Sequence, residues 1–232
     1  VGLPQGAVRE GRERVLAALA NSGYPVPPRR VTVNLAPADI PKAGSAFDLP
    51  IALGLLAADG RLPAGGLEGT CCIGELGLDG GLRRVHGALA VALYCRKAGL
   101  PRLVLPVANA AEAAVVEGVE VVGARRLTDA VDHLAGRRAL PTATSTDTAP
   151  GADPAPDFAD VRGQGVARRA LEIAAAGGHN VLMVGPPGSG KSMMARRLPS
   201  ILPPLTREEA LQATLVHSVS GRLPAGVGLL RS

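Results

Sequence analysis

Asn180-Val-Leu-Met-Val184 runs directly into Gly185-Pro-Pro-Gly-Ser-Gly-Lys-Ser192, and this stretch decides the fold of the C-terminal part of the chain. The first five residues form a short, continuous apolar run of the kind that makes a buried parallel strand. The next eight match the phosphate-loop pattern G-x-x-x-x-G-K-S/T in full, and residues 192–198 favour a helix. A strand, a glycine-rich loop and a helix in this order predict an α/β domain that binds a nucleotide.

Each residue type in the loop has a chemical reason to be there. Glycines at 188 and 190 let backbone N–H groups approach phosphate oxygens closely, in conformations that a Cβ would hinder. The Lys191 ammonium is expected on the β- and γ-phosphates and the Ser192 hydroxyl on Mg²⁺, beside the positive end of the following helix. ATP and Mg²⁺ are therefore the expected cofactors, and the alternative is an incidental glycine-rich turn. The expected binding residues are Gly185, Pro186, Pro187, Gly188, Ser189, Gly190, Lys191 and Ser192.

Hydrolysis needs groups that the rest of the chain does not offer. A P-loop ATPase also uses carboxylates that hold the metal and the attacking water, and an arginine that a neighbouring subunit often supplies. Residues 193–232 contain two acids, Glu208 and Glu209, in a segment that favours a solvated helix with Thr206 as its N-cap. We therefore assign no catalytic residue. We expect the chain to end within the nucleotide-binding domain and not to hydrolyse ATP by itself.

The composition narrows the class of protein. The 232 residues are 47% apolar and 19% charged, which is typical of a globular protein with one large domain or two small ones. Aromatic residues make up 2% with no Trp, which argues against a base-stacking surface for single-stranded nucleic acid. No apolar run is long enough to span a membrane, and the first residues do not resemble a signal peptide. The three cysteines, without CxxC spacing, favour a reducing cytoplasm over a disulfide framework.

The positive charge is concentrated after residue 157. The formal net charge is +5, and residues 158–232 contain nine Lys and Arg against four Asp and Glu. Such an excess favours anionic partners, but it fits a solvated basic face equally well.

Residues 140–156, rich in Pro, Thr, Ser and Ala, interrupt the apolar patterns and predict a flexible linker. We place the linker at 138–157, between a first domain at 1–137 and a second at 158–232. The patterns before it predict a mixed α/β fold, with a hairpin that turns at Asp79-Gly80. The expected strands are 31–35, 71–76, 81–85, 102–106, 120–122 and 180–184, and the expected helices are 49–58, 87–98, 108–117, 128–134, 166–176 and 192–198.

Two long segments resemble one family. They are DFADVRGQGVARRALEIAAAGGHNVLMVGPPGSGKSMMARRLPSILPPLTREEAL, from Asp157, and VGLPQGAVREGRERVLAALANSGYPVPPRRVTVNLAPADIPKAGSAFDLPIALGLLAA, from Val1. Both are similar to the magnesium-chelatase-like AAA+ ATPases of the YifB/ComM type. The resemblance implies a Lon-protease-type α/β domain at the N-terminus, followed by the first part of an AAA+ P-loop domain.

The family resemblance also implies partners and further site residues. It puts Val161, Gly163 and Gln164 near the adenine, with Gly165 where the family commonly has an acid. It implies a ring-shaped, hexameric ATPase when the protein is full length, acting on DNA by branch migration during natural transformation. No membrane partner is expected, because no apolar run is long enough to span a membrane. The alternatives are a metal-chelatase ATPase subunit, a protein-remodelling machine and a pure interaction module. An N-terminal Lon-type domain favours the DNA motor over a chelatase subunit.

The resemblance does not carry protease activity with it. Alignment to the Lon-type motifs puts Ala46 where the family has its nucleophilic Ser, and Leu89 where it has its Lys. An alternative dyad of Ser45 and Lys97 would have to act from displaced positions. We expect residues 1–137 to form a non-catalytic assembly or interaction domain.

Other polar residues favour structural roles. Asp39 and Asp48 could form a carboxylate pair, but Asp48 precedes a helix and is expected to cap it. Cys71 and Cys72 are expected to pack in the interior. The pair at 29–30, both Arg, fits a solvated strand edge better than a phosphate contact. The four histidines lack metal-ligand spacing, so no zinc site is predicted; they are His86, His133, His179 and His217.

Overall fold

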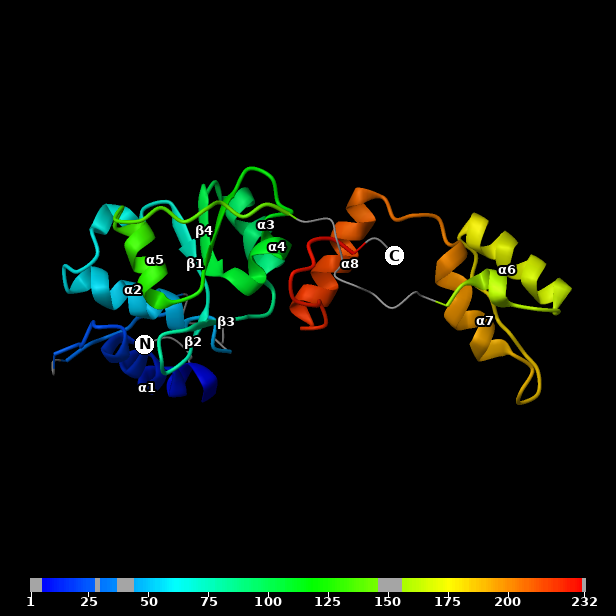
Figure 1. Cartoon of the computed structure of the whole chain (residues 1–232), viewed down its shortest axis with the longest axis horizontal. Coiled ribbons are helices and arrows are strands. Elements are labelled where there is room, and N and C mark those ends of the chain that lie inside the picture. Colours follow the sequence, from blue (N-terminus) through cyan, green and yellow to red (C-terminus); the bar gives the residue numbers. More distant parts are fainter. Residues whose placement is uncertain (1–5, 28–29, 37–43, 146–155, 231–232) are drawn as a thin grey trace. The chain divides into compact units, whose positions relative to one another are not determined.

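The computed structural model describes residues 6–27, 30–36, 44–145 and 156–230, and these form two compact units. Unit 1 consists of the described residues up to 145 together with Ala213–Leu229. Unit 2 consists of residues 156–212 and Leu230. Figure 1 labels the main elements of both units.

Unit 1 is built on a parallel sheet of three strands. They are β1 (Thr70–Cys72), β4 (Arg102–Pro106) and β5 (Glu120–Ala124), in the order β1-β4-β5. Cys72 pairs with Val104, which pairs with Val122 in turn. The strands predicted at 102–106 and 120–122 are thus confirmed, and so is the α/β class; the sheet of unit 1 is parallel.

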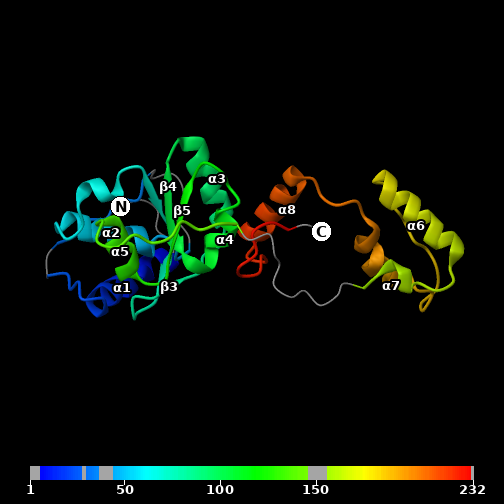
Figure 2. The same ribbon diagram turned by 45° about the horizontal axis from the view of Figure 1, so that its top comes forward.

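Helices cover both faces of this sheet, as Figures 1 and 2 show. On one side are α1 (Gly6–Asn21), α2 (Asp48–Ala58) and α5 (Leu127–Leu134), and on the other are α3 (Ala88–Ala98) and α4 (Ala110–Ala113). Val104 belongs to the core that α1, α2 and α5 form. Its neighbours Leu103 and Leu105 are equally buried and face the other side, because side chains alternate along a strand. This double burial explains the uninterrupted apolar sequence of β4.

A second sheet is the hairpin of β2 (Glu75–Leu76) and β3 (Leu82–Arg83). Its turn contains Asp79-Gly80, as predicted, and the Asp79 carboxylate accepts a hydrogen bond from Gly81 N–H at 3.1 Å, which lowers the pKa of Asp79. The strand predicted at 71–76 is split in two: residues 70–72 pair in parallel with β4, and residues 75–76 form the predicted hairpin with β3, which is shorter than the predicted 81–85. Between these two pairings, with β4 before it and with β3 after it, lies Gly74, whose N–H donates to Ala46 O at 2.9 Å.

Five predicted helices are confirmed to within one residue at each end, as α2, α3, α5, α6 (Gly165–Gly177) and α7 (Lys191–Arg197). The helix predicted at 108–117 is shorter: a 3-10 turn, Val107–Asn109, leads into α4, and the chain then turns to Gly118. Helix α1 has no counterpart among the predictions. Further 3-10 turns are Ala64–Leu67, Phe158–Asp160 and Leu198–Ile201.

Residues 31–35 do not form the predicted strand. They have no regular secondary structure, and Val31 and Val33 are 44% and 37% exposed. Alternating apolar residues favour a strand only where a sheet edge and a core receive them, and these valines reach no buried face. Arg30 is exposed, whereas Arg29 and Asp39 lie outside the described residues.

The first residues of the expected linker lie on the sheet of unit 1. Ala143 N–H donates to Val121 O at 2.8 Å, and Leu140 N–H donates to His133 Nδ1 at 3.1 Å. The pKa of His133 is lowered, mainly by burial and secondarily by the positive charge of Arg102. The lowered pKa favours the neutral ring, in which Nδ1 is available as an acceptor. Residues 140–143 are therefore attached to unit 1, and residues 146–155 lie outside the described part.

Candidate nucleotide-binding site

Unit 2 places the predicted phosphate loop between two helices. Helix α6 is followed by Gly178 in the left-handed conformation, with φ of 63°, and α7 begins at Lys191. Leu171 of α6 and Met194 of α7 share a small core with Phe158 and Val161. This core fixes the two helices that flank the loop.

The segment before the loop is not the buried strand that we predicted. Residues 180–184 are assigned no strand, and Leu182 and Val184 are 89% and 88% exposed. A parallel strand needs a neighbouring strand to pair its backbone and a second layer to bury its side chains. The described part of unit 2 contains no strand that could serve as that neighbour.

The loop itself has the backbone that its glycines predict. Gly188 and Gly190 have φ of 79° and 84°, in the left-handed region where a side chain would be strained. Lys191 folds over the loop, and its Nζ donates to Gly185 O and Pro186 O, both at 2.7 Å, and to the hydroxyl of Ser189 at 3.1 Å. The ammonium is thus held over loop carbonyls, which phosphate oxygens could replace as its partners.

Gln164 reaches the loop from the start of α6. Its Nε2 donates to Ser189 O at 3.4 Å, and among the described non-glycine residues it alone has a positive φ, 53°. Strained backbone of this kind concentrates at ligand-binding positions. The two other residues expected near the adenine differ from it: Val161 is fully buried in the core, and Gly163 has a φ of 70° with open space around its α-carbon.

A cavity of about 350 Å³ adjoins the loop, within the usual size of small-molecule sites. Lys191 is the only charged residue in its described lining. One wall is apolar and the other is the loop, a division that suits a ligand with an aromatic ring at one end and phosphates at the other. The lining consists of Gln164, Ala167, Ala170, Leu171, Val181, Leu182, Met183, Val184, Gly185, Pro186, Ser189, Lys191 and Met194.

The sequence reasoning missed the apolar wall. The pattern in the sequence that could have revealed this wall is the helical spacing of Ala167, Ala170 and Leu171, which places apolar side chains on one face of α6. The remaining predicted loop residues, 187, 188, 190 and 192, are not in the lining. Ser192 lies in the first turn of α7 and is exposed.

The residues present fit a nucleotide that brings its own metal. No group of three or more His, Cys, Asp or Glu within the described ranges could hold a metal ion. Mg²⁺ needs no such group where phosphates and water supply most of its ligands. The exposed hydroxyl of Ser192 would be the ligand from the loop.

The two acids after the loop are solvated, as predicted. Helix α8 (Arg207–Val219) follows Thr206, whose N–H donates to Glu209 Oε2 at 2.9 Å, while Glu209 N–H donates to Thr206 Oγ1 at 3.3 Å. The two bonds form a reciprocal capping box. The Thr206 hydroxyl also donates to Glu209 Oε2 at 2.7 Å, and this bond, together with the one from Thr206 N–H, lowers the pKa of Glu209. Glu208 and Glu209 are exposed.

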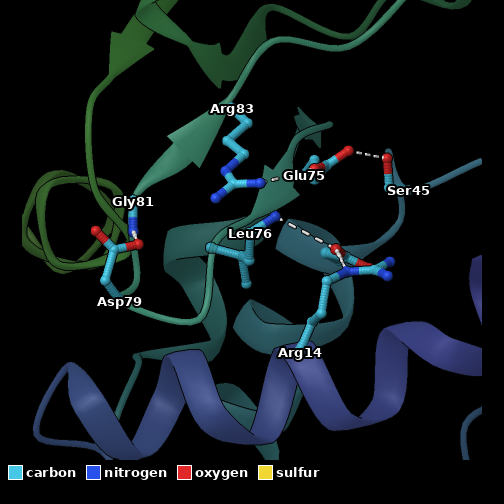
Figure 3. Close-up of polar contacts among 8 residues, drawn as sticks. Arg14, Ser45, Glu75, Leu76, Asp79, Gly81 and Arg83 are labelled. Carbon is cyan, nitrogen blue, oxygen red and sulfur yellow. Dashed lines mark hydrogen bonds and ion pairs between the residues drawn. The ribbon is translucent and has the colours of Figure 1, made fainter.

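Unit 1 carries a polar cluster near the expected protease motifs, drawn in Figure 3. Ser45 donates to Glu75, whose other oxygen lies 3.8 Å from Arg83 Nη1. The hydrogen-bond partner of Ser45 is thus a carboxylate, and Lys97 lies exposed in α3. Leu89, at the position expected for a catalytic Lys, is fully buried.

The capping role predicted for Asp48 is wrong. Its side chain is 2% exposed and binds groups outside α2: Arg14 donates from Nε to Oδ2 at 2.9 Å and from Nη2 to Oδ1 at 3.2 Å. Oδ2 also accepts Leu76 N–H at 3.3 Å. Local sequence suggested a cap, but the main partner is 34 residues away.

Cys71 and Cys72, which were predicted to pack in the interior, are partly buried. Cys71 and Cys72 lie in β1, and Cys95 is buried in α3; all three are free thiols. Burial raises the pKa of Cys71 and of Cys72 to about 12. Among the helices described, none combines the length and apolar character of a membrane span.

Comparisons with known proteins match both halves of the chain. The family described as "Subunit ChlI of Mg-chelatase" matches residues 1–109, and that described as "Magnesium chelatase, subunit ChlI" matches 157–230. YifB of Salmonella typhimurium is 46% identical over 219 residues, and the competence protein ComM of Haemophilus influenzae is 44% identical over 224, each covering 94% of this chain. An uncharacterized protein of Mycobacterium tuberculosis is 44% identical over 231 residues, 99% of this chain.

The chain spans less than half the length of these relatives. It covers 46% of the mycobacterial protein, 43% of YifB and 44% of ComM.

Proposed function

Because this chain belongs to the magnesium-chelatase-like family that includes YifB and ComM, we propose that residues 185–192 bind ATP with Mg²⁺. Lys191 would neutralise the β- and γ-phosphates, and backbone N–H groups at 188–190 would hold phosphate oxygens. Ser192 would bind Mg²⁺, which supplies charge neutralisation on the phosphates. Val161, Gly163 and Gln164 would belong to the segment near the adenine.

The observation that carries this proposal is the position of the Lys191 ammonium. It lies over carbonyls of a loop with two left-handed glycines, at the charged end of an otherwise uncharged cavity. A cation so placed attracts an anionic group, and the apolar wall of α6 suits a base.

We further propose that the longer protein is an AAA+ ATPase that assembles as a ring, a hexamer, and remodels DNA by branch migration during natural transformation. The relative named a competence protein supports a competence-related role. The basic excess of residues 158–232 suits DNA. The second candidate is a metal-chelatase or protein-remodelling ATPase, which the descriptions of both matching families favour.

We assign residues 1–137 to a Lon-protease-type domain without protease activity, 138–157 to a linker and 158–232 to the first part of the AAA+ domain, in a cytoplasmic protein. A buried leucine at 89 and a carboxylate partner for Ser45 support the absence of a Ser–Lys dyad. The lining of the cavity, as far as the described residues form it, contains no carboxylate that could hold an attacking water, so we expect this chain to bind ATP without hydrolysing it.

The site is tested by Lys191→Ala in this chain. Charge-assisted hydrogen bonds contribute about 1.5–3 kcal/mol, so titration with a fluorescent ATP analogue should show affinity weaker by about tenfold or more. Lys97→Ala, which removes an exposed lysine of α3, is the matched control and should bind ATP like the wild type. Equal affinities in the two variants would refute the site.

The substrate is tested in the full-length protein. ATPase activity is measured with and without branched DNA at several salt concentrations, because phosphate contacts weaken as salt rises. Stimulation by DNA that Lys191→Ala abolishes supports the DNA motor. Hydrolysis that DNA leaves unchanged favours the chelatase or protein-remodelling ATPase.

A further inference from the structure

Ser189 takes part in several of the hydrogen bonds that hold the phosphate loop. Its hydroxyl accepts an N–H of the Lys191 ammonium at 3.1 Å, its carbonyl accepts an N–H of Gln164 Nε2 at 3.4 Å, and its own N–H donates to Pro186 O at 3.4 Å. The phosphate-loop pattern leaves this position open to any residue, so it assigns the side chain no role. The contacts of the hydroxyl therefore call for an account of their own.

All three donors of the Lys191 ammonium are engaged within the loop. An ammonium carries three N–H donors and no acceptor. Gly185 O and Pro186 O accept two of them, both at 2.7 Å, and the Ser189 hydroxyl accepts the third. A phosphate oxygen that is to accept a hydrogen bond from Lys191 must therefore replace one of these three acceptors.

The Ser189 hydroxyl is the acceptor that a phosphate oxygen replaces first. Its bond to Nζ is the longest of the three. The two carbonyl oxygens belong to the backbone and move only with the loop, whereas the hydroxyl turns about the Cα–Cβ bond between staggered rotamers. A phosphate oxygen also carries negative charge, and a hydrogen bond between two charged groups is stronger than one to a neutral hydroxyl.

The surroundings of Ser189 allow the hydroxyl both to reach the ammonium and to leave it. A Cβ at position 185 would lie 3.2 Å from Ser189 Oγ, so the glycine there keeps the approach uncrowded. Ser189 is half-buried and lines the cavity, where a released hydroxyl can bind water. Gln164 holds the Ser189 carbonyl, so the side chain can turn while the backbone stays in place.

We propose that Ser189 is an internal competitor of the nucleotide: its hydroxyl occupies the position that a phosphate oxygen takes beside Lys191, and binding of ATP exchanges one for the other. The inference rests on the proposed function and adds to it a residue that limits the affinity of the site. The bond between the hydroxyl and the ammonium must break before the phosphate binds, so Ser189 weakens the binding of ATP.

The exchange is tested by titrating this chain and its Ser189→Ala variant with a fluorescent ATP analogue and Mg²⁺. Removal of the competing hydroxyl should strengthen binding by about threefold or more, within the contribution of one hydrogen bond. Ser220→Ala, which removes an exposed hydroxyl after α8, is the matched control and should bind like the wild type. Unchanged affinity in Ser189→Ala overturns the exchange, and so does weaker binding, which would mean that the hydroxyl contacts the nucleotide.

A second pair of variants shows whether the effect depends on Lys191. In a chain that already carries Lys191→Ala, the addition of Ser189→Ala should change ATP affinity by less than about twofold, because the hydroxyl then has no ammonium to bind. If Ser189→Ala strengthens binding there as much as it does in the wild type, it acts on the loop in another way and the exchange is overturned.

The contact itself is tested without nucleotide, by brief labelling of lysines with acetic anhydride followed by mass spectrometry. Ser189→Ala should raise the labelling of Lys191 by about twofold or more, because the amine has lost one hydrogen bond that restrains it. Lys97, exposed in α3, is the internal standard. Equal labelling of Lys191 in both proteins overturns the contact and the exchange. If neither protein binds ATP, the proposed function and the exchange are both refuted, while the labelling still decides the contact.

Discussion

Asp48 shows how one buried charge organises unit 1. Its carboxylate accepts hydrogen bonds from Arg14 of α1 and from Leu76 of β2, so three elements meet at this residue (Figure 3). Gly11 makes the approach of α1 possible, since a Cβ there would lie 2.7 Å from Asp48 Oδ1. A buried carboxylate is stable only when such donors compensate its lost hydration.

Asp48→Ala should destabilise unit 1 by about 3 kcal/mol, the lower end for a broken buried ion pair. The lower end applies because the Arg14 side chain is 24% exposed and keeps some contact with water. Urea denaturation followed by circular dichroism measures the loss. Asp132→Ala removes an exposed partner of Arg137 and should cost less than about 1 kcal/mol, so an equal effect of the two variants would contradict this account.

At the scale of elements, five helices were predicted to within one residue at each end, although α1 was missed, whereas the isolated strands were not predicted correctly. A helix satisfies its own backbone, so apolar spacing and a terminal glycine suffice to locate α6, with Gly178 at its end. A strand depends on a partner elsewhere, which is why the strands predicted at 31–35 and 180–184 are wrong. The left-handed glycines of the loop at 185–192 were predicted from spacing alone, because residue type dictates which positions adopt that backbone. The Lys191 contacts and the strained Gln164 depend on tertiary geometry and left no local signal.

Replacing a leucine by alanine at two positions tests whether the segment 180–184, before the phosphate loop, is exposed. Leu182 is 89% exposed, so Leu182→Ala should change stability by less than about 0.5 kcal/mol. Leu171, 1% exposed, is the control, and Leu171→Ala should cost about 2–5 kcal/mol. Amide exchange of α6 in this chain reports both. A large loss in Leu182→Ala would mean that residues 180–184 are buried as a strand.

For the whole molecule, the dependence of stability on pH includes a contribution from His133. Burial and the charge of Arg102 lower its pKa in the folded chain, below the value of about 6.5 expected when unfolded. Below about pH 6.5 the unfolded chain therefore binds a proton that the folded chain resists. The contribution is complete above that pH, and it is lost as the pH falls towards the folded pKa.

His133→Asn should flatten this dependence, because asparagine does not titrate in this range yet can accept the hydrogen bond from Leu140 N–H. The measurement is the free energy of unfolding in urea at several values between about pH 7.5 and 5.5, where the slope from one histidine is at most about 1.4 kcal/mol per unit. His179→Asn, which removes an exposed imidazole, should keep the wild-type slope. If His133→Asn keeps it too, the loss of stability comes from other groups, and protonation of His133 does not weaken the attachment of residues 140–143 to the sheet.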